Sequence, residues 1–181
     1  MRFFQLPTYN AELLFLICEI IEKNMPDLDQ FDMRILAAMQ RDASRPTAEI
    51  AQAIGLSQAP CWRRIQRLKE NGYIRKQVAI VDRSKIGLNA QIFAQVKLTA
   101  TGRSNVNAFA DAIREFPEVL DCFVLMGAVD FLLRIVTRDI EAYERFFFDK
   151  LSQVPGVQEI NSIVALSEVK STTELPLELL D

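Results

Sequence analysis

Arginine and glutamine side chains gather between residues 58 and 67, and such side chains can donate hydrogen bonds to base edges and to phosphates. In a helix, which rotates by about 100° per residue, Arg63, Gln66 and Arg67 project from one side. The residues on the roughly opposite side are apolar: Cys61, Ile65 and Leu68. The spacing predicts a helix that packs through one face and presents the other to DNA. An ordinary surface helix with solvated arginines is the alternative.

A second helix is expected just before it, with Ile50, Ala51 and Ile54 on one apolar stripe. Gly55 can take the left-handed conformation that ends a helix, and Ser57 can cap the next helix two residues later. Two helices joined by so short a turn form a helix-turn-helix. We predict that the following residues contact DNA: Thr47, Ser57, Gln58, Ala59, Trp62, Arg63, Arg64 and Arg67.

Trp62 lies beside the apolar stripe, where it either packs between helices or touches the DNA backbone. Cys61 is expected to be a small buried core residue. The cysteines at 18, 61 and 122 lack metal-like spacing, and their odd number argues for a reducing cytoplasm. The chain has no histidine, the commonest general base and zinc ligand. We therefore expect no enzyme, no cofactor and no metal site.

The stretch from Met126 to Asp130, which joins two strands that we expect to be buried, is a second candidate for binding chemistry. Backbone N–H groups around Gly127, which permits a sharp turn, can receive a carboxylate, and Asp130 can meet an ammonium group. These are the two charges of a free amino acid. Glycine and aspartate are also ordinary hairpin residues, so a plain turn is the alternative. The candidate effector-binding residues are Met126, Gly127, Ala128, Val129, Asp130 and Phe131.

The elements that position the cationic helix belong to a predicted helix-turn-helix domain, winged-helix-like, at residues 27–75. Asp29 is expected to cap its first helix. The inner face of that helix is predicted to comprise Phe31, Ile35, Leu36 and Met39. The N-cap of the next helix is open. Pro46 occupies the position three residues before Glu49 where a capping side chain usually stands, so that only Ser44 or Thr47 can supply the cap.

The loop at 126–130 belongs to a predicted α+β domain at residues 89–168. A linker at residues 76–88 precedes this domain and is expected to contain a short strand around Val78, Ile80 and Val81. Alternating or continuous apolar runs predict strands at 92–98, 119–125, 131–136 and 157–166. Between them, one helix is capped by Ser104 and stops before Pro117, and another runs from Asp139 to Pro155. This βαββαβ order is the ferredoxin-like arrangement, an antiparallel sheet with both helices on one face. One apolar face of the second helix is predicted to comprise Ile140, Tyr143, Phe147, Leu151 and Val154.

Charge is distributed unevenly although the net value is only -3. Residues 27–83 hold ten basic against seven acidic residues, whereas residues 84–181 hold nine against fourteen. The positive balance coincides with the helix-turn-helix, as phosphate binding requires. No apolar run reaches the roughly 18 residues of a membrane span. Residues 1–26 form an extension of uncertain status, and residues 169–181 a tail.

The motif residues together resemble the DNA-binding signature of the Lrp/AsnC family of transcriptional regulators. They are Ile54-Gly55-Leu56-Ser57, Pro60-Cys61-Trp62, Arg64-Ile65, Arg67-Leu68 and Gly72-Tyr73-Ile74, with Leu28-Asp29, Asp32 and Ile35-Leu36 upstream. The resemblance runs to about Pro176. Since similar proteins begin near Met25, residues 1–26 are either an appended amphipathic helix or the product of an upstream start codon.

The resemblance implies that the second domain senses amino acids, forms homodimers or higher assemblies such as octamers, and binds its effector between subunits. Gly127, Asp130 and Phe131 match the effector-pocket motif of the family, while Ala128 and Val129 depart from its usual residues. Similarity of residues 167–176 to one subgroup hints at a polar or sulfur-containing effector.

We interpret the chain as a sequence-specific regulator that binds double-stranded DNA and responds to a small amino acid. The alternative is a metabolite-binding module or small enzyme whose helical domain serves association. For the second domain alone, a purely structural dimerisation role is the competing interpretation.

Overall fold

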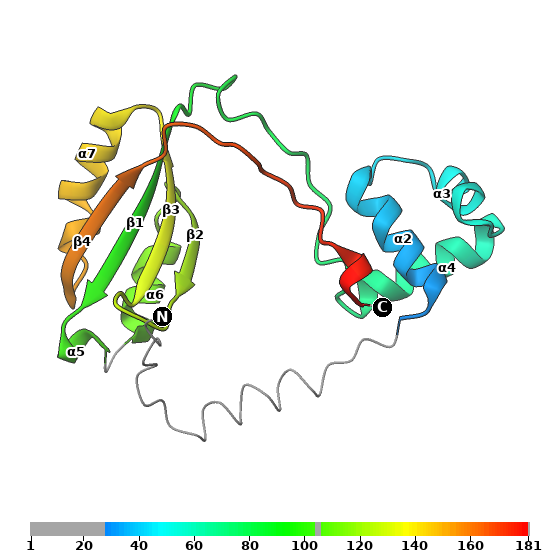
Figure 1. Cartoon of the computed structure of the whole chain (residues 1–181), viewed down its shortest axis with the longest axis horizontal. Coiled ribbons are helices and arrows are strands. Elements are labelled where there is room, and N and C mark those ends of the chain that lie inside the picture. The colour runs from blue at the N-terminus through cyan, green and yellow to red at the C-terminus, as the bar shows by residue number, and fades with distance from the viewer. Residues whose placement is uncertain (1–27, 104–105, 181) are drawn as a thin grey trace, which may run out of the picture. The chain divides into compact units, whose positions relative to one another are not determined.

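The computed structural model describes residues 28–103 and 106–180. The chain divides into two units (Figure 1). One contains the described residues up to Val78 together with the segment from Thr172, and the other runs from Ala79 to Ser171. The extension at 1–26 lies outside the described residues.

Three helices make the first unit: α2 (Gln30–Arg41), α3 (Thr47–Ile54) and α4 (Gln58–Glu70). Each helix contributes one apolar stripe to a shared core, which includes Ile35 of α2, Ile50 of α3 and Leu68 of α4. Cys61 is fully buried in this core, as predicted. The helix-turn-helix prediction is therefore confirmed, with α3 and α4 as its two helices.

The turn between α3 and α4 depends on Gly55. Its φ of 77° is left-handed, and the following Leu56 N–H donates to the Ala51 carbonyl at 2.9 Å. A side chain at Gly55 would be strained in this conformation. This glycine therefore sets the abrupt change of direction that brings α4 across α3.

The helix caps agree with the sequence only in part. Asp29 caps α2 as predicted, in a reciprocal capping box with Asp32. Ser57 occupies the N-cap position of α4 as predicted, and Pro46 occupies that of α3, so neither Ser44 nor Thr47 replaces it; neither helix receives a side-chain cap hydrogen bond. The Ser44 hydroxyl donates to Asp42 instead, and Ser57 has the extended backbone of a cap without the side-chain bond.

A wing was also expected after the helix-turn-helix. The described residues between α4 and Val78 contain no strand, so the winged-helix part of the prediction is not realised there. The chain instead folds back through a turn in which the Ile74 N–H donates to the Leu68 carbonyl at 3.1 Å.

The second unit is a four-stranded antiparallel sheet in the order β2-β3-β1-β4 (Figure 1). Its elements follow the predicted βαββαβ order, with short helices added. They are β1 (Ala90–Leu98), α5 (Ala100–Arg103), α6 (Val106–Arg114), β2 (Val119–Val124), β3 (Phe131–Thr137), α7 (Ile140–Asp149), η1 (Leu151–Gln153) and β4 (Val157–Val164).

Both longer helices pack on the same face of this sheet. Phe109 of α6 and Phe146 of α7 share one core with Ile92, Val96 and Leu133, which are alternate residues of the central strands. This arrangement follows from the period of two along a strand, which places every second side chain on one face. The other face carries no helix among the described residues of this unit.

Four expectations for the chain beyond residue 75 were wrong. No strand forms at Val78–Val81, because this segment has no neighbouring strand to pair with among the described residues and its side chains are exposed. Helix α7 ends at Asp149, well before Pro155, and Ile140 is exposed while Phe146 takes an inner position. Strand β2 lies at the edge of the sheet and is largely exposed, whereas we expected a buried strand. The predicted cap Ser104 lies outside the described residues.

The C-terminal segment lies against the first unit (Figure 1). The Gln40 amide makes two bonds with the backbone of Leu175, at 3.3 and 2.7 Å, and Arg41 pairs with Glu174 at 3.0 Å. A short 3-10 helix, η2 (Leu177–Leu180), follows.

Within the described residues, no helix combines the length and the apolar character needed to cross a bilayer.

Candidate DNA-binding and effector sites

The first turns of α4 form an exposed polar surface. Gln58, Ala59 and Arg63 are exposed, and Trp62 keeps 53% of its accessible area. Trp62 therefore does not pack between helices. Ser57 is exposed just before the helix, and Thr47 is half-buried at the start of α3. The N-terminal half of α4 is thus available to a groove of DNA, the part of a recognition helix that contacts base edges.

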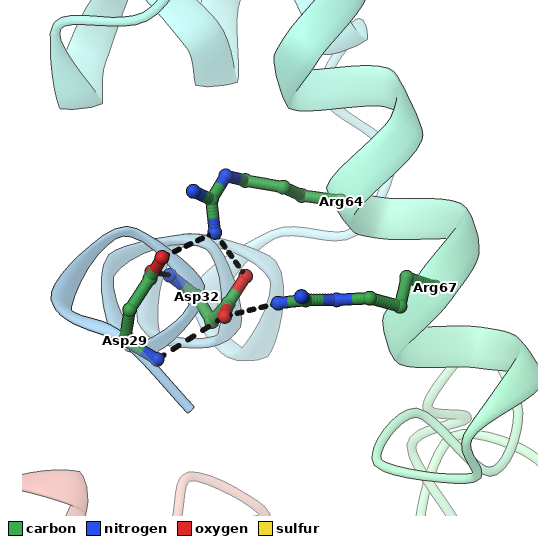
Figure 2. A network of polar contacts seen from close by, with 4 residues as sticks. All are labelled: Asp29, Asp32, Arg64 and Arg67. Atoms are coloured by element: carbon green, nitrogen blue, oxygen red, sulfur yellow. Dashed lines mark hydrogen bonds and ion pairs between the residues drawn. The ribbon is translucent and has the colours of Figure 1, made fainter. Parts of the chain in front are cut away.

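Arg64 and Arg67 lie further along α4 and bind aspartates of α2 (Figure 2). Arg64 Nη1 donates to Asp29 Oδ2 at 2.6 Å and to Asp32 Oδ1 at 2.9 Å. Arg67 Nη2 donates to Asp32 Oδ2. These two arginines, predicted to contact DNA, are therefore engaged within the domain.

Asp32 is the centre of this network, and its side chain is fully buried. A buried carboxylate is costly unless its charge is paired and its oxygens accept hydrogen bonds. Here Arg64 and Arg67 supply the compensating positive charges, and the Asp29 N–H donates a further hydrogen bond to Asp32 Oδ2 at 3.2 Å. The network therefore fixes α4 against the start of α2.

The same contacts shift the titration of the exposed partners. The Asp32 N–H, followed by the Arg64 guanidinium, lowers the pKa of Asp29. Asp32 and then Asp29 raise the pKa of Arg64. Both shifts favour the charged forms of Asp29 and Arg64.

Asp32 was not among the residues predicted to have a functional role. A signal was present, since Asp29 and Asp32 stand three residues apart at a helix start, and Arg64 and Arg67 stand three apart on another helix. Residues at this spacing share a helix face, so two acids and two bases could meet as a block. Nothing in the separate patterns indicated which faces meet.

The second candidate site is the loop between β2 and β3. Met126, Gly127 and Ala128 are exposed, and Val129 and Asp130 are half-buried. Phe131 is 1% exposed and stacks on Phe109, with ring centroids 4.4 Å apart. Phe131 therefore belongs to the core of the chain, below the exposed part of the loop.

Asp130 already has partners in the chain. Its Oδ2 accepts from the Leu98 N–H at 2.7 Å, and Arg103 Nε lies 3.1 Å from Oδ1 and 3.2 Å from Oδ2. Arg103, which was not among the predicted site residues, is half exposed and places a cation beside the loop. The site therefore holds a carboxylate and a guanidinium side by side.

Gly127 does not have the conformational role expected of it. Its φ is not left-handed, and a Cβ placed there would meet nothing within 4 Å. The absence of a side chain leaves the loop backbone open without being required by the turn.

The described residues contain no group of three or more histidine, cysteine or carboxylate side chains that could hold a metal ion. Cys61 and Cys122 are free thiols, and burial raises the pKa of each.

Two family descriptions match the two units. Residues 28–69 match the AsnC-type helix-turn-helix domain, and residues 91–175 match the Lrp/AsnC ligand binding domain. A proline dehydrogenase transcriptional activator of Rhizobium radiobacter is 36% identical over 146 residues, which cover 81% of this chain and 94% of the relative. The chain belongs to the Lrp/AsnC family. These matches do not support the alternative prediction, a metabolite-binding module or small enzyme whose helical domain serves association.

Other Lrp/AsnC relatives have regulatory names. The transcriptional regulator AzlB of Bacillus subtilis (strain 168) is 34% identical over 151 residues, covering 83% of this chain and 96% of AzlB. The DNA-binding transcriptional activator DecR of Escherichia coli (strain K12) is 33% identical over the same length, covering 83% of this chain and 99% of DecR.

Two solved structures are similar over most of their length. An AsnC family regulator from Agrobacterium tumefaciens has a TM-score of 0.80 at 36% identity, covering 84% of this chain and 99% of that chain. A transcriptional regulator from Neisseria meningitidis in complex with L-Met has a TM-score of 0.81 at 35% identity, with the same coverage. This member of the Lrp/AsnC family is therefore a DNA-binding transcriptional regulator with a ligand-binding domain.

Proposed function

We propose that this regulator reads DNA through the N-terminal half of α4, using Gln58, Ala59, Trp62 and Arg63. The observation that carries the proposal is the exposure of this polar surface opposite a fully buried apolar stripe. Ser57 and Thr47 stand at the starts of α4 and α3, where hydroxyl and backbone N–H groups suit phosphate contacts. We propose that the protein is cytoplasmic, where it meets the DNA, and that it is a regulator and not an enzyme.

Arg63→Ala tests this reading surface. If Arg63 contacts a base, the variant should lose about 1–3 kcal/mol of specific binding, measured by gel shift on the DNA upstream of the protein's own gene. Lys69→Ala, at the far end of α4, is the control and should retain the affinity for the preferred sequence. Equal losses in the two variants would contradict a reading surface at the start of the helix.

We further propose that residues 126–130 and Arg103 bind a small α-amino acid. The exposed backbone around Gly127 can receive the ligand carboxylate, assisted by the Arg103 guanidinium, and Asp130 can receive the ammonium group. The complex of the N. meningitidis relative with L-Met supports an amino acid as the ligand class. The exposed Met126 offers an apolar contact for the ligand side chain.

Asp130→Asn tests the effector site, because asparagine can still accept the Leu98 N–H bond while lacking the charge. Calorimetry with the twenty amino acids should show binding to the wild type and a loss of about tenfold or more in the variant, since charge-assisted bonds contribute about 1.5–3 kcal/mol. Asp149→Asn, at the end of α7, should bind normally. Absence of binding to the wild type would leave the domain as an assembly platform only.

We propose that the regulator works as a homodimer or a higher homo-oligomer. The sheet face opposite α6 and α7 carries apolar side chains at Phe93, Phe123, Leu132 and Ile163, of which Phe123 is 54% and Ile163 is 46% exposed. Contiguous exposed apolar surface of this kind marks an interface. Two copies would also present two recognition helices, as binding to paired half-sites requires.

A further inference from the structure

The polar network around Asp32 has a consequence for DNA binding that depends on how charge is distributed along α4. Helix α4 carries three arginines, and two of them lie beside carboxylates of α2. Arg63 differs from them, since it forms no ion pair within the described residues. The positive charge that faces outward on this helix is therefore smaller than its sequence indicates.

We propose that Asp29 and Asp32 withhold Arg64 and Arg67 from DNA phosphates, and that they thereby lower the sequence-independent part of the regulator's affinity for DNA. This inference rests on DNA binding through α4, as proposed above. Figure 2 shows both guanidinium groups turned toward the start of α2, where two negative charges balance two positive ones.

The geometry favours this role over simple surface pairing. Asp32 is fully buried, so it cannot turn to solvent if its arginines leave for a phosphate. Arg64 keeps only 28% of its side-chain area exposed and lies over the Phe31 ring, with Cζ 5.6 Å from the centroid. Removing either arginine from Asp32 would leave a buried charge short of a partner, which opposes transfer to DNA.

Withholding these charges matters most for non-operator DNA. Phosphate contacts supply nearly all of the affinity for arbitrary sequences, whereas base contacts supply the difference between sequences. A helix that keeps two arginines away from the backbone therefore loses affinity for all DNA alike, and the base contacts at the start of α4 make up a larger share of what remains. The ratio of operator to non-operator binding stays the same, whereas both affinities fall and become less dependent on salt.

The slope of log affinity against log salt measures this directly, because each neutralised phosphate contributes about -0.9 to it on duplex DNA. Arg67→Gln should leave the slope on a non-operator duplex unchanged, because Arg67 is ion-paired with Asp32 and contacts no phosphate. Arg63→Gln should make the slope shallower by about 0.9 per protomer, which is about a 3.5-fold smaller loss of affinity between about 50 and 200 mM salt. Arg63 is exposed, and in Arg67→Gln the glutamine amide can still donate to Asp32 while Arg64 keeps its ion pair, so both variants should fold.

Asp32→Asn tests the inference from the other side. It retains the size of the side chain but releases the charge on Arg67, so affinity for non-operator DNA should rise and the slope should steepen by about 0.9 per protomer. Asp42→Asn is the matched control, because it removes the same charge from α2's C-terminal end, where the carboxylate binds Ser44 and no residue of α4. Only the Asp32 variant should change the slope.

A shallower slope in Arg67→Gln would overturn the inference, because it would show that Arg67 contacts phosphate in the wild type. If Asp32→Asn does not fold, the comparison of Arg67→Gln with Arg63→Gln decides alone. If the wild type shifts no duplex at about 50 mM salt, the proposed DNA contacts of α4 fail instead, so the two failures are distinguishable.

Discussion

At the scale of single residues, the first unit depends on a buried carboxylate. Asp32 has no exposed surface, yet it belongs to the first turn of α2, where an acidic side chain is stabilised by the helix dipole and the capping box. Its remaining stabilisation comes from two arginines on another helix. The domain therefore tolerates changes at its exposed arginine better than at its paired ones.

Arg64→Ala should lower the free energy of unfolding by about 1–3 kcal/mol, because it leaves Asp32 with one fewer charged partner. Arg63→Ala, one position earlier on α4, should change it by less than about 0.5 kcal/mol, as is usual for exposed positions. Urea unfolding followed by circular dichroism measures both. Similar stabilities for the two variants would contradict a structural role for the network.

Two glycines of the second unit should differ in how much stability the protein loses when the glycine is replaced by alanine. A Cβ on Gly102 would lie 2.5 Å from the carbonyl oxygen of Gly156, whereas a Cβ on Gly127 meets nothing within 4 Å. We expect Gly102→Ala to cost about 1–3 kcal/mol through overpacking and Gly127→Ala to cost less than about 0.5 kcal/mol. Thermal unfolding of the two variants provides the comparison, and a severe loss in Gly127→Ala would show that the loop needs glycine.

At the scale of elements, apolar periodicity predicted the central helices and all four strands, because each buries one face against a single core. It failed at 76–83, where an apolar run has no partner strand and so gains no ladder of hydrogen bonds. The end of α7 was misplaced because Pro155 was read as the terminator. The helix already ends at Lys150, whose backbone leaves the helical region, and a 3-10 turn follows.

The candidate sites were predictable to different degrees. The exposed residues at the start of α4 follow from the position of the buried stripe. The partners of Arg64 and of Asp130 do not, since each lies about thirty residues away in the chain and is selected only when helices or strands pack. Periodicity gives the face of an element but not the residue that meets it.

Helix α7 supplies a prediction for pH. Its cap Asp139 accepts the Ala142 N–H at 2.7 Å, and this bond, followed by Arg138, lowers the pKa of Asp139. A lowered pKa means that the carboxylate stabilises the fold above the pKa of the unfolded chain, near 3.9, and that this contribution is lost as pH falls through the lower folded value. The urea midpoint should therefore fall on acidification below about pH 4.

Asp139→Asn separates this cap from the other carboxylates. Asparagine is also a good N-cap but does not titrate, so the variant should show a smaller fall of the midpoint between about pH 5 and pH 3. The exposed Asp111→Asn on α6 is the control for generic charge loss. A midpoint that falls equally in wild type and Asp139→Asn would contradict the assignment.

At the scale of the whole molecule, the unpartnered face of the sheet predicts self-association. Phe123→Asp places a charge on this face and should shift the protein toward monomer in sedimentation, because burying an unpaired charge in an interface is strongly unfavourable. Phe148→Asp, equally exposed on the outer side of α7, should keep the assembly state of the wild type. Unchanged assembly in both variants would exclude this face as the interface.

The contact of the C-terminal segment with α2 has a consequence for the order in which the chain acquires its structure during translation. The core of α2, α3 and α4 comes entirely from residues 28–74, so it can form while the ribosome is still adding the sheet. Glu174 is synthesised 133 residues after its partner Arg41, a delay of about 7–27 s at about 5–20 residues per second. During that interval a nascent chain can have a folded helix-turn-helix in which Gln40 and Arg41 lack their contacts with Leu175 and Glu174.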